Sequence, residues 1–469
     1  MRTHSSINYA FKEDENMKKV DFLIEYEVKP REFDSMCLVA AYLKSKGYTV
    51  EFVNSWECLY SRPEPCEAEV AVISACYDDG TYDYFAGMAY SFKKVVNMQW
   101  EQVLRNRVYK PHPYEFGDYI EVALKTRHVC WGEKEKAWQE SMFGVPSEYL
   151  RVTGYPPLDF YRPEFKKFLV PREELFARYG LDPQKKTLLF ISSFATIGLP
   201  SSEKFEDVDS IREVSIVSQK TILDWFERFV REYPDMQLIY RAHPAEKDNK
   251  DIRAIAEKYK NFFVIPEQPI RHWIAACDRF LNWWSTSAME IYFSGKNMHV
   301  LRPVPVPDYM DLCVFEDAKF IDNYEDMEKA IFSDPPFPIP LEKLFRWYDI
   351  QDKPAYKRIG DWLIDTYKSK NYSSRPSKDN IYKRTLLGRG KQWLKNTAVF
   401  ASLSYWLLNT VGENKLTKKM TAAVEHAKAE KEMHDPNSYR AQKRKQNSAD
   451  AQEIESRINE FLKVINENS

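Results

Sequence analysis

Hydrophobic positions along the chain alternate between short apolar runs, which are typical of buried strands, and amphipathic stretches, which are typical of helices. In the first block, strands are predicted at 20–24, 48–53, 70–76, 94–98 and 128–131. A helix with an apolar face follows the first strand and ends at Gly47. Strands and helices in alternation predict a parallel sheet covered by helices, so residues 18–165 are expected to form a doubly wound α/β domain.

A second block repeats this alternation over residues 180–345. Strands are predicted at 187–192, 237–240, 262–265, 279–283 and 299–301, and helices at 214–233, 251–259, 270–277 and from the 285–287 region to Ser294. The prolines at 156, 157 and 163 separate the blocks and indicate a linker or hinge. Residues 346–469 are expected to form a helical, charged extension.

Length and composition fit this organisation. A chain of 469 residues is too long for one core, and its 44% hydrophobic and 15% aromatic content exclude a largely disordered protein. The formal net charge of −2 provides no overall field to attract a polyanion, so a nucleic-acid partner is not expected.

Cysteines and the amino-terminal segment indicate a reducing compartment. The seven cysteines are scattered without zinc-binding spacing and are expected to be buried, free thiols. Residues 1–17 contain no apolar signal-peptide region, and no run reaches the ~20 apolar residues that cross a bilayer. The expected location is therefore cytoplasmic.

Two motifs follow predicted strands of the second block, where ligands bind in open α/β sheets. The first is Arg241-Ala242-His243-Pro244, in which the imidazole and the guanidinium can contact a phosphate. The alternative is a histidine that ends a strand and bonds to its own loop.

The second motif is Ser285-Thr286-Ser287, followed three residues later by Glu290. Hydroxyl groups at the start of a helix, together with free backbone N–H groups, favour an anion. The alternative is an ordinary helix cap in which Glu290 is the capping-box partner of Ser287. Because both motifs end strands of one predicted sheet, His243 and the three hydroxyl residues are expected to converge on one anionic ligand.

These motifs, with Glu246, Trp283-Trp284 and Gly295-Lys296, resemble the donor-binding half of GT-B glycosyltransferases. The ordered set is most similar to bacterial surface carbohydrate biosynthesis proteins, including Kdo transferases and sialyltransferases with an HP motif. Trp131-Gly132-Glu133 and residues 152–156 resemble the family's approach to the interdomain linker, and residues 32–35 resemble its first helix. The resemblance spans roughly residues 18–303 and implies two Rossmann-like domains that face a cleft.

The resemblance implies a nucleotide-sugar-dependent enzyme. Arg241, His243, Pro244, the hydroxyl residues at 285–287 and Glu290 would bind the donor, a CMP-linked Kdo-like or sialic-acid-like sugar being one candidate. The sugar would pass, with inversion, to a surface polysaccharide or a lipid-linked glycan. Alternatives on the same scaffold are a glycerophosphotransferase, a sugar-nucleotide epimerase and a non-catalytic scaffold of a polysaccharide assembly complex.

An inverting transfer needs a carboxylate that accepts the proton of the acceptor hydroxyl. Two candidates follow strands of the first block: the pair Asp78 and Asp79, and Glu101. Asp78-Asp79-Gly80 resembles the acidic motif of bacterial sialyltransferases and is also a common turn sequence. Glu101 occupies the place of the acidic motif of the surface carbohydrate proteins, but Gln102 replaces the expected glycine. Both candidates stay open.

Two further features were assigned from sequence. Asp207-Val208-Asp209 resembles a metal-nucleotide motif but lies in a predicted acidic loop, so neither a metal nor a cofactor is expected. In the extension, the uncharged segment 397–411 is flanked by basic residues within 383–419. It is expected either to lie peripherally on the inner membrane face or to dock on the catalytic domain. Beyond Thr421 a solvated or self-associating helix is expected.

Overall fold

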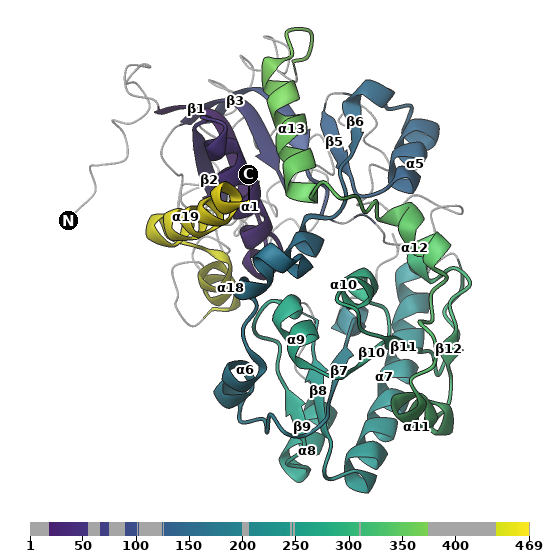
Figure 1. Cartoon of the computed structure of the whole chain (residues 1–469). Helices are drawn as coiled ribbons and strands as arrows, with labels where there is room; N and C mark the ends of the chain where they lie inside the picture. Colours follow the sequence, from purple (N-terminus) through teal and green to yellow (C-terminus); the bar gives the residue numbers. More distant parts are fainter. Residues whose placement is uncertain are drawn as a thin grey trace, which may run out of the picture.

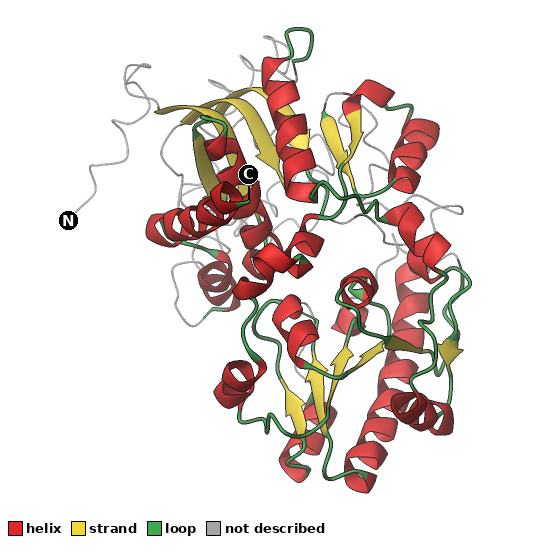
Figure 2. Cartoon of the chain, in the orientation of Figure 1, coloured by secondary structure: helices red, strands yellow, loops and turns green. Residues whose placement is uncertain are grey.

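The computed structural model of the chain describes residues 18–54, 66–74, 90–100, 102, 124, 126–198, 206–243, 246, 249–308, 311–373 and 438–468. Two parallel sheets of six strands form its upper and lower halves, and helices cover both (Figure 1). Figure 2 shows the same layers by type of secondary structure. The predicted α/β architecture of two parallel sheets covered by helices is confirmed.

The first sheet has the strand order β2-β1-β3-β4-β5-β6, and all neighbouring strands are parallel. Its strands are β1 (Lys18–Tyr26), β2 (Val50–Asn54), β3 (Cys66–Ile73), β4 (Tyr90–Asn97), β5 (Arg127–Cys130) and β6 (Leu150–Val152). The five predicted strands are present, although β3 begins and ends earlier than the prediction 70–76. The edge strand β6 was not predicted.

The second sheet has the order β12-β11-β10-β7-β8-β9, again with parallel neighbours. Its strands are β7 (Thr187–Ile191), β8 (Gln237–Arg241), β9 (Phe262–Val264), β10 (Arg279–Asn282), β11 (Met298–Leu301) and β12 (Phe320–Ile321). This is the 3-2-1-4-5-6 order of doubly wound sheets, in which the chain changes direction between β7 and β10. The two-residue strand β12 was not predicted.

Helices cover the faces of both sheets. The α-helices are α1 (Asp34–Ser45), α5 (Glu133–Phe143), α6 (Arg172–Tyr179), α7 (Glu206–Glu232), α8 (Lys250–Lys258), α9 (Ile270–Ala276), α10 (Ala288–Phe293), α11 (Tyr324–Ser333), α12 (Leu341–Trp347), α13 (Ala355–Lys368), α18 (Tyr439–Asn447) and α19 (Ala451–Glu467). Shorter helical turns are η2 (Lys29–Phe33), η3 (Ser147–Tyr149), η4 (Pro156–Tyr161), η5 (Pro163–Phe168), η6 (Phe194–Gly198) and η7 (Cys313–Phe315). Within the described ranges, none of the helices has the length and apolar character needed to traverse a bilayer.

Helix α7 corrects one prediction. It begins at Glu206, earlier than the predicted start at residue 214. Asp207 and Asp209 therefore lie in its first turn and not in an acidic loop. Acidic residues are favoured there because the amino-terminal end of a helix carries a partial positive charge.

The carboxyl-terminal extension returns to the first domain, where α13 and α19 both pack against α1 (Figure 1). Four apolar side chains of α19 are buried: Ile458, Phe461, Val464 and Ile465. The prediction of a solvated helix beyond Thr421 is therefore wrong for residues 451–467. The basic and uncharged segment 383–419 lies outside the described residues.

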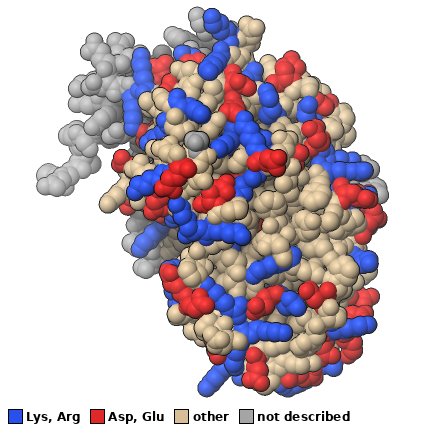
Figure 3. Space-filling view, in the orientation of Figure 1, with Lys and Arg blue, Asp and Glu red and all other residues tan. Residues whose placement is uncertain are grey.

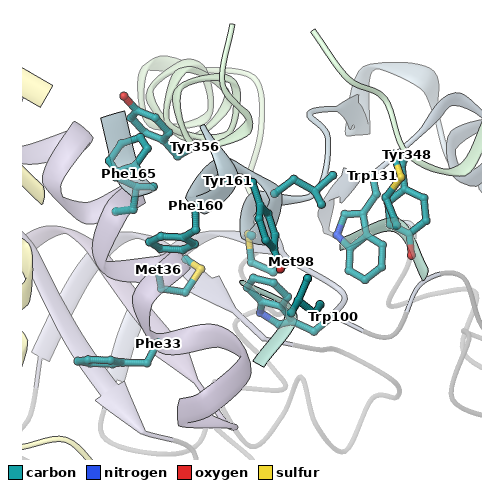
Figure 4. Close-up of a cluster of buried hydrophobic side chains, with 14 of the residues drawn as sticks. Phe33, Met36, Met98, Trp100, Trp131, Phe160, Tyr161, Phe165, Tyr348 and Tyr356 are labelled. Atoms are coloured by element: carbon teal, nitrogen blue, oxygen red, sulfur yellow. The ribbon is translucent and has the colours of Figure 1, made fainter. Parts of the chain in front are cut away.

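The predicted linker is a packed connection. Turns η4 and η5 are initiated by prolines, and every residue of η4 is buried. Figure 4 shows Phe160 and Phe165 between Met36 of α1 and Tyr356 of α13. The buried Asp159 carboxylate accepts hydrogen bonds from the first backbone N–H groups of α13, at Ala355 and Tyr356 (3.0 and 2.7 Å). The linker is thereby fastened to the extension.

Cysteine burial agrees with the prediction. Cys37, Cys130, Cys277 and Cys313 are buried and have free thiols. Burial raises the pKa of the Cys277 thiol to about 12, so it stays protonated and packs as a small apolar group.

A close contact at Gly360 of α13 gives a stability prediction. In an exposed helix, Gly→Ala stabilises by about 1 kcal/mol. At Gly360, however, an added Cβ would lie 2.8 Å from Cε1 of Tyr42 and closer still to its Cδ1. Gly360→Ala is therefore expected to destabilise the protein by about 1–3 kcal/mol in urea unfolding. The double variant Gly360→Ala/Tyr42→Leu should recover part of this loss, and a stabilised single variant would contradict the packing of α13 on α1.

Candidate active site

The carboxyl edges of the two sheets face each other. Trp131 follows β5 in the first domain, and its ring is stacked on Tyr348 with centroids 5.8 Å apart. The Tyr348 hydroxyl donates a hydrogen bond to the backbone oxygen of Thr286, which follows β10 in the second domain (3.4 Å). A second link is the ion pair between Arg271 of α9 and Asp34 of α1. Motifs at both sets of strand ends therefore lie at the domain boundary.

The change of direction between β7 and β10 marks where a doubly wound sheet opens at its carboxyl edge, and ligands bind there. Residues 285–287 directly follow β10, and Arg241 ends β8, on the other side of β7. Neighbouring strands are about 4.8 Å apart, so the ends of β8 and β10 are separated by roughly 10 Å. The two motifs thus flank the place where this topology binds a ligand.

Arg241 is partly committed to the protein. Its guanidinium donates hydrogen bonds to the backbone oxygens of Glu267 and Gln268 (2.7 and 2.6 Å), which belong to the loop before α9. Burial lowers its pKa to about 10, opposed by the charge of Glu267, so it remains charged at neutral pH. The donor-binding role of Arg241 stays a prediction.

His243 lies just beyond β8 and is exposed. Its backbone oxygen accepts a hydrogen bond from the backbone N–H of Glu246 (2.8 Å). Pro244 lies outside the described residues. The structure thus exposes His243 at the carboxyl edge of the second sheet.

The hydroxyl motif is held by a residue that the sequence analysis did not single out. Asn282, the last residue of β10, accepts a hydrogen bond from the backbone N–H of Ser285 (2.8 Å) and donates one to its backbone oxygen (2.9 Å). The Ser285 and Ser287 hydroxyl oxygens lie 3.1 Å apart. Asn282 is fully buried and therefore fixes the turn that presents these hydroxyls.

The alternative interpretation of the hydroxyl motif, a capping box, is not observed. Ser287 precedes α10 but makes no side-chain capping hydrogen bond. Its backbone has helical dihedral angles (φ −66°, ψ −2°), whereas a capping residue is normally extended. The Glu290 carboxyl is therefore not used as the partner of Ser287.

Glu290 is instead a buried acid at the domain boundary. Burial raises its pKa to about 7, and the positive charges of Arg271 and Arg241 oppose the rise. Its charge also acts on Tyr161 of the interdomain connection. A pKa near 7 means that this carboxyl is partly protonated at neutral pH.

Between the two predicted motifs, the charges of Arg241 and Glu290 each act on the pKa of the other. Among the described contacts, none joins His243 directly to residues 285–287. Their convergence on one anion, across β7, stays a prediction.

Comparisons with known proteins find matches among solved structures. No family model and no curated protein sequence matches the chain. S. aureus MnaA in complex with UDP is 16% identical, with 75% of this chain and 97% of that chain covered and a TM-score of 0.46. UDP-GlcNAc 2-epimerase from Neisseria meningitidis, bound to UDP-GlcNAc, is 13% identical (74% and 99% covered, TM-score 0.44). The wall teichoic acid polymerase TagF is 11% identical (75% and 90% covered, TM-score 0.49).

The predicted catalytic carboxylates Asp78, Asp79 and Glu101 all lie outside the described residues. Gln102, beside Glu101, is buried and joins two strand ends. Its side-chain nitrogen donates a hydrogen bond to the backbone oxygen of Val129 (2.8 Å). Its side-chain oxygen accepts one from the backbone N–H of Trp131 (2.9 Å). The glutamine that replaces the expected glycine thus has a structural role of its own.

Metal ligands are not gathered in the described ranges, where no group of three or more His, Cys, Asp or Glu residues is placed to hold an ion. On the face of the molecule shown in Figure 3, basic and acidic side chains are interspersed. The expectation of a metal-independent protein stays a prediction.

Two surface hollows lie at the opposite edge of the second sheet. One, of about 400 Å³, is lined by residues that include Lys185, Gln237 and Lys260, and the other, of about 250 Å³, by Lys186 and Asp278. These residues lie at the amino ends of strands, away from both motifs. Strand direction therefore locates the candidate site better than the size of a hollow does.

Proposed function

We propose that the protein is a glycosyltransferase that uses a nucleotide-sugar donor bound by its second domain. One observation carries the proposal: two motifs with phosphate-binding chemistry flank the point where the second sheet changes direction, on the edge that faces the first domain. The resemblance of the ordered motifs to GT-B glycosyltransferases supports the same assignment.

In this proposal the donor phosphates lie across the end of β7. The His243 imidazole approaches them from β8, and the hydroxyls of Ser285 and Ser287 approach from β10. Hydrogen-bond donors fixed before the reaction stabilise the charge that develops on the leaving phosphate. Glu290, with its pKa of about 7, binds a pair of sugar hydroxyls at the domain boundary.

The first domain would supply the acceptor surface and the base, with Glu101 and the Asp78/Asp79 pair as the candidates. A surface polysaccharide or a lipid-linked glycan is the proposed acceptor, and contact with the inner face of a membrane would involve 383–419. Holding donor and hydroxyl in line would provide much of the rate acceleration.

Donor hydrolysis and sugar transfer by the purified protein, measured with a panel of CMP- and UDP-sugars, test this proposal. His243→Ala is expected to lower kcat/KM by about 10²-fold, the usual effect of removing one donor to a developing anion. Ser333→Ala, which removes a hydroxyl from the end of α11, is the matched control and should leave turnover unchanged.

Equal turnover by the wild type and His243→Ala would count against the proposal. Isomerisation of the donor without sugar transfer would identify an epimerase, and release of CMP from CDP-glycerol a glycerophosphotransferase. A protein that binds none of these nucleotides would be the non-catalytic scaffold.

A further inference from the structure

We propose that Glu246 is a positioning residue for His243: its carboxylate fixes the turn that presents the imidazole at the carboxyl edge of the second sheet. The inference deepens the proposed function, because it concerns how the predicted phosphate contact is held in place. Its geometry does not depend on which nucleotide binds.

The Glu246 carboxylate is held by three side chains, from strand β8, helix α7 and the residue that follows β7. It accepts hydrogen bonds from the Tyr240 hydroxyl (2.6 Å), the Gln219 amide (3.0 Å) and the Ser192 hydroxyl. All three donors are buried, at 0%, 6% and 3% exposure respectively, so none can move freely. The carboxylate is thus fixed against β8, α7 and the end of β7.

The same carboxylate reaches the backbone of His243. Its second oxygen lies 3.4 Å from the His243 backbone nitrogen, and the Glu246 N–H donates to the His243 backbone oxygen (2.8 Å). These two contacts join residue 243 to residue 246 in both directions. A displacement of Glu246 would therefore displace the residue that carries the imidazole.

Gln219, which contacts Glu246, also contacts the residue that caps α8. The Gln219 side-chain oxygen accepts a hydrogen bond from the Asn249 amide (2.8 Å), and Asn249 caps α8 through the backbone N–H of Asp251. Gln219 therefore holds Glu246 with its amide nitrogen and Asn249 with its oxygen. One residue of α7 therefore contacts both Glu246 and the residue that caps α8.

The chemistry of Glu246 favours positioning over charge pairing. All three side-chain donors are neutral, and among the described residues no lysine or arginine pairs with this carboxylate. Both carboxylate oxygens of Glu246 accept hydrogen bonds. A glutamine could not replace both acceptors, because its amide nitrogen cannot accept a hydrogen bond. Glu246→Gln is accordingly expected to loosen the turn while preserving the volume of the side chain.

The first test needs no ligand. Nuclear magnetic resonance of protein labelled with ¹⁵N in its eight histidines reports each imidazole, and His243→Asn identifies the resonance of His243. Glu246→Gln is expected to shift the His243 ring signals and to leave the other histidines unchanged. An unchanged His243 signal would overturn the proposal.

Tyr240→Phe removes the donor that lies 2.6 Å from the carboxylate and keeps the ring in place. It should shift the His243 signals in the same direction by a smaller amount, and it serves if Glu246→Gln does not fold. The matched control is Thr221→Val, which removes a hydroxyl that bonds only to its own helix at Val217 and should have no effect.

A double-mutant cycle with UDP and CMP, measured by calorimetry, tests the link to binding. Glu246→Gln is expected to weaken nucleotide binding about tenfold in the wild type and to cause almost no further loss in His243→Ala. Equal losses in both backgrounds would show that Glu246 acts independently of His243 and would refute the inference. If the wild type binds neither nucleotide, the proposed function fails, while the resonance experiment still decides the role of Glu246.

Discussion

Replacing Arg271 with alanine is expected to lower the free energy of unfolding by about 3 kcal/mol, the lower end of the range for breaking a buried ion pair, because Asp34 then keeps only the partly exposed Arg457 as its cation. The side chains of Arg271 and Asp34 are only 9% and 13% exposed and form an ion pair across the domain boundary. The Arg271 guanidinium also lies over the Phe160 ring, 4.7 Å from its centroid. Denaturant unfolding followed by circular dichroism measures the loss.

Arg457 of α19 provides the matched control. It pairs with the same carboxylate of Asp34 at 3.1 Å, but its side chain is 35% exposed. Arg457→Ala is therefore expected to cost about 1 kcal/mol or less, as solvent-accessible ion pairs do. Similar losses for the two arginines would contradict the assignment of Arg271 as the buried link between the domains.

Glu290→Gln is expected to remove a pH dependence of stability worth about 3 kcal/mol. The pKa of Glu290 is about 7 in the folded protein and 4.5 without burial. Between these values the folded state holds a proton that the unfolded state has lost, so stability falls as pH rises from about 4.5 to 7. The glutamine variant stays neutral, and its advantage over the wild type should grow across this window.

The difference in stability between the wild type and Glu290→Gln, measured by thermal unfolding at several pH values, isolates the contribution of Glu290. Burial also lowers the pKa of His272 to about 3 and that of His299 to about 4, and these groups change stability in the opposite direction. Both histidines are present in the wild type and in the variant, so their contributions cancel. A constant difference from pH 5 to pH 8 would show that Glu290 is not a buried acid.

The sheets were largely predictable because each long strand is a compact apolar run between turn residues. Strands β6 and β12 have three and two residues and pair on one side only, which is too little to form a pattern. Helix α19 was predictable in principle, since its buried residues at 458, 461 and 465 have helical spacing. The charged residues around them dominate its composition and led to the wrong prediction of a solvated helix.

The strand-end motifs were predictable for a topological reason: carboxyl ends of parallel strands share one edge. Their detailed use was not, because it depends on contacts between residues far apart in the chain. Arg271 and Asp34 are separated by 237 positions, and neither has a local sequence signal. Likewise, a pattern that places Arg241 at the end of a strand does not reveal its hydrogen bonds. Its guanidinium donates to backbone oxygens of the loop before α9.

The return of α13 and α19 to the first domain has a consequence for the order of folding on the ribosome. All strands of the second sheet lie between residues 187 and 321, whereas α1, made from residues 34–45, is covered by a helix that ends at residue 467. Domains generally acquire structure as their segments emerge. The first domain is therefore complete only after the last helix has been synthesised. All strands of the second sheet are synthesised before that helix.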